Sequence, residues 1–160
     1  MHDWQNDNTF TGYCGDCQPA GDYNSYFSFD LRQVLGEVTS ATLILELEAF
    51  LGTDASENAE IHDVSTSAGM LENGTTSSSV YDDLGSGKLY GSYAALPNER
   101  DSQLEIRLSA QAVADINAAR GGDFSVGVSI TSLTQSAIVE GLRFSMDDEE
   151  RVHRLVLGLN

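Results

Sequence analysis

The two cysteines of the chain, Cys14 and Cys17, stand three positions apart, and this spacing serves three different chemistries. It can form a redox-active dithiol, half of a zinc site, or a short disulfide. A redox dithiol needs its first cysteine at the start of a helix, but Pro19 follows closely and no helical pattern continues. A structural zinc site needs four nitrogen or sulfur ligands, and the sequence has no second C-x-x-C and no paired histidines. We therefore predict a disulfide that stiffens a surface loop.

Calcium is the ion that the acidic loops would take, because it prefers six to eight oxygen ligands. No cofactor is expected to be required. The N-terminal stretch has the densest mixture of carboxylate and amide oxygens, from Asp3, Asn6, Asp7 and Asn8. Two further loops also carry such oxygens, one with Asp54, Glu57 and Asn58 and the other with Asp147, Asp148 and Glu149. None of the three has the spacing of an EF-hand, so solvated loop charge is the alternative.

Carbohydrate recognition is suggested by three tyrosines in and beside the stretch "YDDLGSGKLYGSY", namely Tyr81, Tyr90 and Tyr93. Aromatic rings beside carboxylates and amides form platforms for sugars, although tyrosine also packs at the ends of strands. Asn73 begins an N-x-[ST] sequon and is a candidate glycosylation site.

Catalysis is not predicted. The sequence has neither G-x-S-x-G nor H-E-x-x-H, and its three histidines, His2, His62 and His153, are better explained as strand or loop residues. With 25 acidic residues, some pair of carboxylates will lie at a glycosidase-like separation by chance.

The charge of the chain restricts its partners. It has 25 Asp and Glu against 8 Lys and Arg, for a formal net charge of −17. This balance argues against nucleic acids and anionic membrane surfaces, which bind clustered cations. No apolar run approaches the roughly 18 residues of a membrane span, and the polar first ten residues are not a signal peptide. The chain is therefore cytoplasmic or a mature form. Scarce lysine and the local cysteine pair favour an extracellular location.

The elements that would position these candidate sites are mainly strands. Residues 41–49 alternate Leu43, Leu45 and Leu47 with Ile44, Glu46 and Glu48, which predicts a half-buried strand with the leucines inward. Similar patterns predict strands at 25–31, 59–64, 103–108, 124–130, 137–145 and 154–159. One short helix is predicted near residues 110–120, with Ser109 as its N-cap. Polar loops between so many strands indicate an all-β antiparallel sandwich of jelly-roll-like type.

The order of these motifs resembles a family of secreted bacterial β-sandwich ectodomains associated with PEP-CTERM sorting tails, and the DNRLRE-type jelly-roll modules. The matching stretches are "YFSFDL" (26–31), "VTSATLILEL" (38–47), "IHDVSTS" (61–67), "YDDLGSGKLYGSY" (81–93), "INAARGGDFSVG" (116–127) and "RLVLGL" (154–159). The resemblance implies a secreted sandwich and an extracellular role, and none of the motifs is catalytic. The chain ends at Asn160, after the last motif, so anchoring by a sorting tail is not expected.

The first 24 residues lack a clean strand alternation and read as an N-terminal arm, followed by a sandwich domain at 25–160. Trp4, Phe10 and Tyr13 are aromatic anchors in this polar arm. Such a segment packs on its own domain or adds to a sheet edge of a neighbouring protomer, and repeated addition gives a fibre. We therefore predict a non-catalytic, self-assembling surface or matrix module, with a lectin-like carbohydrate-binding module as the alternative.

Overall fold

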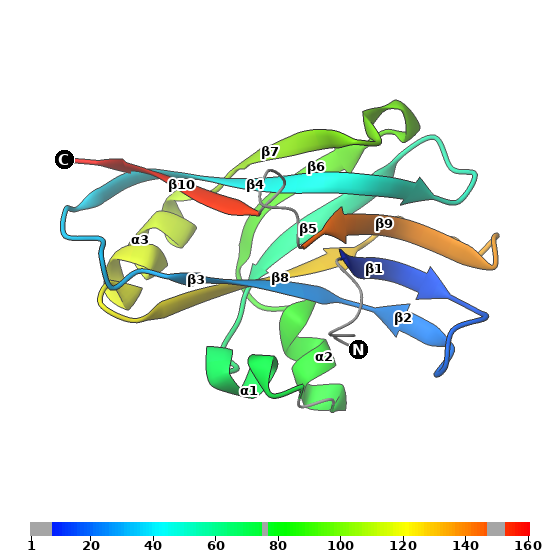
Figure 1. Cartoon of the computed structure of the whole chain (residues 1–160), viewed down its shortest axis with the longest axis horizontal. Helices are drawn as coiled ribbons and strands as arrows, with labels where there is room; N and C mark the ends of the chain where they lie inside the picture. Colours follow the sequence, from blue (N-terminus) through cyan, green and yellow to red (C-terminus); the bar gives the residue numbers. More distant parts are fainter. Residues whose placement is uncertain (1–7, 75–76, 147–152) are drawn as a thin grey trace.

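The computed structural model of the chain describes residues 8–74, 77–146 and 153–160. In these residues ten strands form two antiparallel sheets that pack face to face (Figure 1). The larger sheet contains β1 (Asn8–Cys14), β2 (Gly21–Tyr23), β4 (Val38–Leu51), β7 (Ser102–Arg107), β9 (Val139–Ser145) and β10 (Arg154–Leu159). The smaller sheet contains β3 (Ser25–Asp30), β5 (Glu57–Asp63), β6 (Leu89–Ala95) and β8 (Asp123–Ile130). The predicted all-β antiparallel sandwich is confirmed.

The long strand β4 organises the larger sheet. It pairs with β7 along one edge, while β10 and β9 follow one another along its other edge. From β9 the sheet continues through β1 to β2, and the smaller sheet has the order β3-β8-β5-β6. The turns that connect the two sheets therefore meet at the ends of the sandwich, where polar side chains of different strands can converge.

The core lies between the sheets and follows the predicted alternation. Leu43, Leu45 and Leu47 are fully buried and face residues of the smaller sheet such as Phe27 and Ile61. One outward position of β4 differs from the prediction, because Glu46 is only 6% exposed. Glu46 lies opposite Gln103 of β7, between the part of β4 that pairs with β10 and the part that pairs with β9.

The predicted helix is present as α3 (Ala110–Ala119), and the Ser109 side chain accepts a hydrogen bond from the Ala112 N–H at its start. The prediction of a single helix was wrong, since α1 (Ala68–Glu72), α2 (Ser78–Leu84) and the 3₁₀ turn η1 (Pro97–Glu99) are also present. Figure 1 shows α1 and α2 together on one side of the sandwich. The close approach of α2 to β8 requires Gly127, because a Cβ there would lie 2.1 Å from the Leu84 carbonyl oxygen.

The described part of the predicted arm belongs to the sandwich. Strand β1 pairs with β9 along its whole length and with β2 at its end, so residues 8–23 are integral to the larger sheet rather than an arm beside it. Gly12 lies opposite Gly141, and both have positive φ, +143° and +141°. A Cβ at either position would strike the backbone of the other strand at 2.1–2.2 Å, so only glycine fits this crossing.

The longest helix in the described ranges has ten residues, and none there is long and apolar enough to cross a membrane.

Two neighbouring residues of β7 test the facing of the sheets. Leu104 is fully buried, whereas Glu105 is exposed. Leu104→Ala should lower the free energy of unfolding by about 2–5 kcal/mol, because it leaves a cavity in the core. Glu105→Ala should change it by less than about 0.5 kcal/mol. Urea denaturation measures both values, and equal losses would contradict the assigned faces.

Candidate functional site

A groove of about 440 Å³ lies where β2, α2 and the end of β8 meet. Tyr23 and Tyr81 line it together with the carboxylates of Asp22 and Asp82. Amide and hydroxyl groups of Asn24, Ser86, Ser129 and Thr131 complete its polar lining. Tyr81 is 39% exposed, so part of its surface is open to a ligand. The combination of aromatic rings with several hydrogen-bonding groups suits a polyhydroxylated ligand.

Helix α2 is held in place by contacts at its start and at its middle. At its start, the Ser77 hydroxyl oxygen accepts a hydrogen bond from the Val80 N–H. Asn24 then donates a hydrogen bond from Nδ2 to the Tyr81 carbonyl oxygen, at 3.1 Å, which ties the β2–β3 junction to the helix. These contacts fix the Tyr81 backbone next to β2.

Asp83 connects α2 to the chain that follows β5. Its carboxylate accepts hydrogen bonds from the N–H and hydroxyl groups of both Ser65 and Thr66, at 2.7–3.2 Å. Burial acts to raise the pKa of Asp83, but these hydrogen bonds outweigh it, and the pKa lies below its ordinary value of 3.8. Asp83 is therefore ionised at neutral pH and acts as a clamp for the helix.

The Tyr81 hydroxyl remains a hydrogen-bond donor at neutral pH. Burial raises its pKa, and the nearby carboxylates of Asp22 and Asp82 raise it further.

The other two predicted carbohydrate residues lie outside the groove. Tyr90 is only 2% exposed, stacks on Phe124, and donates its hydroxyl to Asp115 Oδ2 at 2.7 Å. Its ring faces the core and is closed to a sugar, which corrects that candidate. Tyr93 donates its hydroxyl to Glu99 Oε1 at 2.6 Å and is half-buried. Of the three tyrosines, only Tyr81 lines the groove. Its partner there, Tyr23, is an aromatic residue of the predicted arm and was not among the carbohydrate candidates.

Three carboxylates meet at one end of the sandwich, from Asp54 in the β4–β5 loop, Glu57 in β5 and Glu140 in β9. One oxygen atom of each lies within 4.8 Å of the others. Glu57 and Glu140 are both fully buried. The acidic loop at 52–60 was one of the predicted calcium candidates, and the structure adds Glu140 to it while leaving Asn58 exposed.

Strand alternation explains why the two glutamates are inside. Glu57 shares its face of β5 with buried Ala59 and Ile61, and Glu140 shares its face of β9 with buried Leu142 and Phe144. Strands β5 and β9 belong to opposite sheets, so the two side chains enter the same layer from both sides. The sequence analysis missed Glu140. The signal that could have found it is its spacing of two and four residues from Leu142 and Phe144, which puts all three side chains on the same face of a strand.

Among these three carboxyl groups, Glu57 has a pKa raised above its ordinary value. Burial raises its pKa; a hydrogen bond from Ser132 opposes this rise, and the charges of Glu140 and Asp54 add to it. Glu140 is held by donors of the β8–β9 loop: Thr134 N–H to Oε1 at 2.6 Å and Ser136 N–H to Oε2 at 3.2 Å.

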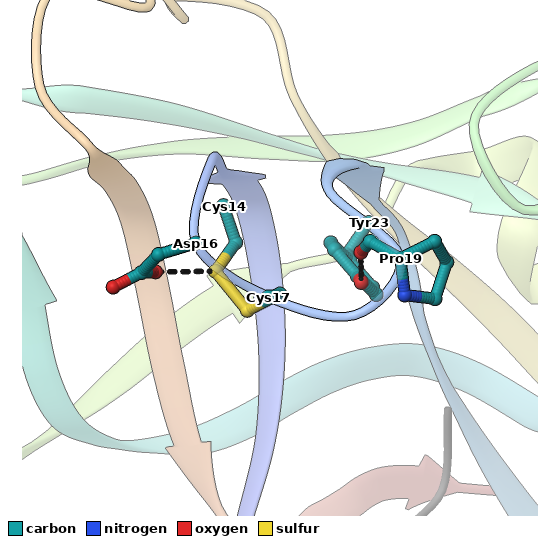
Figure 2. Close-up of a disulfide and its surroundings, with 5 residues drawn as sticks. All are labelled: Cys14, Asp16, Cys17, Pro19 and Tyr23. Atoms are coloured by element: carbon teal, nitrogen blue, oxygen red, sulfur yellow. Dashed lines mark hydrogen bonds between the residues drawn. A yellow bond between two sulfur atoms is a disulfide. The ribbon is translucent and has the colours of Figure 1, made fainter.

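The predicted disulfide is confirmed, since the Sγ atoms of Cys14 and Cys17 are bonded at the end of β1 (Figure 2). The Asp16 carboxylate lies 3.3 Å from Cys14 Sγ, but the two sulfurs are bonded to each other and offer no thiolate to a metal. Beyond the disulfide, the Tyr23 hydroxyl donates a hydrogen bond to the Pro19 carbonyl oxygen (Figure 2). The disulfide thus stiffens the connection that carries Asp22 and Tyr23 to the groove.

Several residues named in the sequence analysis lie outside the described residues. These are Trp4 of the arm, the calcium candidates Asp3, Asn6 and Asp7, the loop residues Asp147, Asp148 and Glu149, and His2. Asn8 begins β1, opposite Ser145. Of the other arm residues, Tyr13 lies opposite Glu140 in the β1–β9 pair, and the Phe10 ring lies 6.0 Å from that of Tyr23.

Asn73 is exposed after α1, with its Nδ2 donating to the Gly69 carbonyl oxygen, and its glycosylation stays a prediction.

Neither described histidine lines the groove. His62 is 7% exposed, with Nε2 3.2 Å from Glu60 Oε2. His153 packs against Phe27 and Phe29, and burial lowers its pKa.

No family model and no curated protein matches this chain.

Asp83 and Asp82 form a matched pair of neighbours on α2. Asp83→Asn should lower the free energy of unfolding by about 1–2 kcal/mol at pH 7, because the charge that accepts the four donors is lost. Asp82→Asn should have little effect, since that side chain is exposed. Because the folded-state pKa of Asp83 is lowered, its contribution is present above about pH 4 and is lost as the pH falls further. Chemical denaturation at pH 7 and pH 3 tests this, and a difference between wild type and Asp83→Asn that is as large at pH 3 as at pH 7 would argue against the clamp.

Proposed function

We propose that the chain is a non-catalytic module of an extracellular surface or matrix protein and that it binds polysaccharide in the groove between β2 and α2. The observation that supports this proposal is the groove itself, which places Tyr23 and Tyr81 beside two carboxylates and several amide and hydroxyl groups. Sugar rings present apolar C–H faces to aromatic side chains and hydroxyl groups to polar ones. The groove is open to solvent, so it can admit part of a longer chain.

An extracellular location fits this role. The Cys14–Cys17 disulfide is typical of oxidising compartments. A net charge of −17 favours uncharged or basic ligands over polyanions. The resemblance to secreted bacterial sandwich modules points in the same direction and is part of the proposal.

Self-assembly is a second candidate function, favoured by an open sheet edge. Strand β10 pairs only with β4 among the described strands, so its other edge is free to accept a strand. Val156 and Leu159 of this strand are 50% and 52% exposed, and Leu35 is 88% exposed. Because β1 is paired within its own sheet, the donated segment would come from residues 1–7, which include Trp4.

The groove is tested by polysaccharide binding. Tyr81→Ala should weaken binding by about tenfold or more, which corresponds to the loss of about 1.4 kcal/mol from an aromatic contact. Leu89→Ala, which removes an exposed apolar side chain outside the groove, should bind like wild type. A panel of soluble polysaccharides in affinity electrophoresis identifies the ligand class, and isothermal titration calorimetry then compares the variants. Binding that is absent in wild type, or is unchanged in Tyr81→Ala, would contradict the proposal.

The assembly candidate has a different readout. Protomers of charge −17 repel each other, and the screening length falls from about 30 Å at 0.01 M salt to about 8 Å at 0.15 M. Association should therefore strengthen with salt and be lost in both Trp4→Ala and Val156→Lys. Sedimentation equilibrium measures this, and a wild-type protein that is monomeric at both salt concentrations would exclude fibre formation through this edge.

A further inference from the structure

We propose that Asp54, Glu57 and Glu140 form a binding site for one divalent cation of the calcium type. The observations that support this inference do not depend on polysaccharide binding in the groove. It concerns the carboxylate cluster at the end of the sandwich, where the β4–β5 and β8–β9 loops connect the two sheets.

The first argument is the balance of charge. Three carboxylates approach within 4.8 Å, and two of them are fully buried. None of the ion pairs formed by the described residues involves any of the three. The donors that surround them are the neutral hydroxyl and N–H groups of Ser132, Thr134 and Ser136. Buried carboxylates are normally paired with a cation or coordinate a metal, and here no side chain of the described residues supplies the positive charge.

The second argument is an unsatisfied atom. Glu57 is 0% exposed, and its Oε1 has no hydrogen-bond partner, whereas its Oε2 accepts a hydrogen bond from the Ser132 hydroxyl. A buried carboxylate oxygen without a partner is costly, and native structures usually satisfy it with a protein group, a water molecule or an ion. The Glu57 carboxylate belongs to the cluster, and bidentate binding by this carboxylate would bring Oε1 onto an ion held there.

The third argument is the chemistry and spacing of the donors. The cluster offers only oxygen atoms, which selects hard cations over zinc or copper. Calcium binds oxygen at about 2.3–2.6 Å, so two oxygens on one ion lie at most about 5 Å apart. The observed limit of 4.8 Å satisfies this condition. Each carboxylate oxygen has a second lone pair, so Glu140 can keep its hydrogen bonds to the loop while it binds the ion. Asp54 is half-buried and gives the ion a route from solvent.

The test compares the chelator-treated full-length protein with and without Ca²⁺. Isothermal titration with Ca²⁺ should show one site in the wild type, and millimolar Ca²⁺ should raise the melting temperature. Glu57→Gln should weaken Ca²⁺ binding at least tenfold and abolish the rise in melting temperature. Without Ca²⁺, this variant should be at least as stable as wild type, because the nearly isosteric amide removes like-charge repulsion. Glu140→Gln should also lose binding, but Glu57→Gln alone is sufficient if that second variant does not fold.

Glu105→Gln is the matched control, since it removes one exposed acidic charge on β7 and should bind Ca²⁺ like wild type. A wild-type protein that binds none of Ca²⁺, Mg²⁺ and Mn²⁺ at millimolar concentration would overturn the proposal. Binding that survives in both Glu57→Gln and Glu140→Gln would also overturn it, because the ion would then lie elsewhere, for example at the N-terminal acidic stretch.

Discussion

The side chains of two glutamates enter the core from opposite sheets, and the need to balance their charge constrains this end of the sandwich. Glu57 and Glu140 are fully buried and share a small volume with Asp54, so three like charges compete for one poorly hydrated space. The β8–β9 loop supplies Ser132, Thr134 and Ser136 as hydrogen-bond donors to these carboxylates. The conformation of that loop therefore depends on how the charge of the cluster is balanced, by a proton on Glu57 or by a cation.

The same loop also forms one wall of the groove. Thr131 and Leu133 line the groove, whereas Ser132 and Thr134 reach the carboxylates, so alternate residues serve the two sites. The loop continues to Ile138, whose carbonyl oxygen accepts a hydrogen bond from the Gly15 N–H inside the disulfide turn. A cation bound at the cluster would thus order a groove wall, and the disulfide would hold the opposite strand β2. This link gives a physical reason for an ion and a polysaccharide to act on one module.

Most of the fold could be predicted because alternating strands carry a strong signal. The buried faces of β4, β7 and β8 are those that the period-two pattern assigned, and the Cys14–Cys17 disulfide and α3 were also predicted correctly. Helices α1 and α2 were missed because five and seven residues are too short to show a helical period. Two of the three residues of the cluster were predicted, since Asp54 and Glu57 are close in sequence. Glu140 was not predicted, because it joins them only through the packing of two sheets. The place of Tyr23 in the groove was missed for the same reason, because Tyr81 is distant in the chain and lines the same groove only in the folded structure.

The central claim is that a cation balances the buried carboxylates, and anomalous diffraction tests it most directly. Crystals grown with Ca²⁺ would be measured at a long X-ray wavelength, where calcium scatters anomalously. The account predicts one peak about 2.3–2.6 Å from oxygen atoms of Asp54, Glu57 and Glu140. A map with no peak at this position, in which Glu57 Oε1 instead lies within hydrogen-bonding distance of Glu140, would show that a proton balances the charge and would contradict the account.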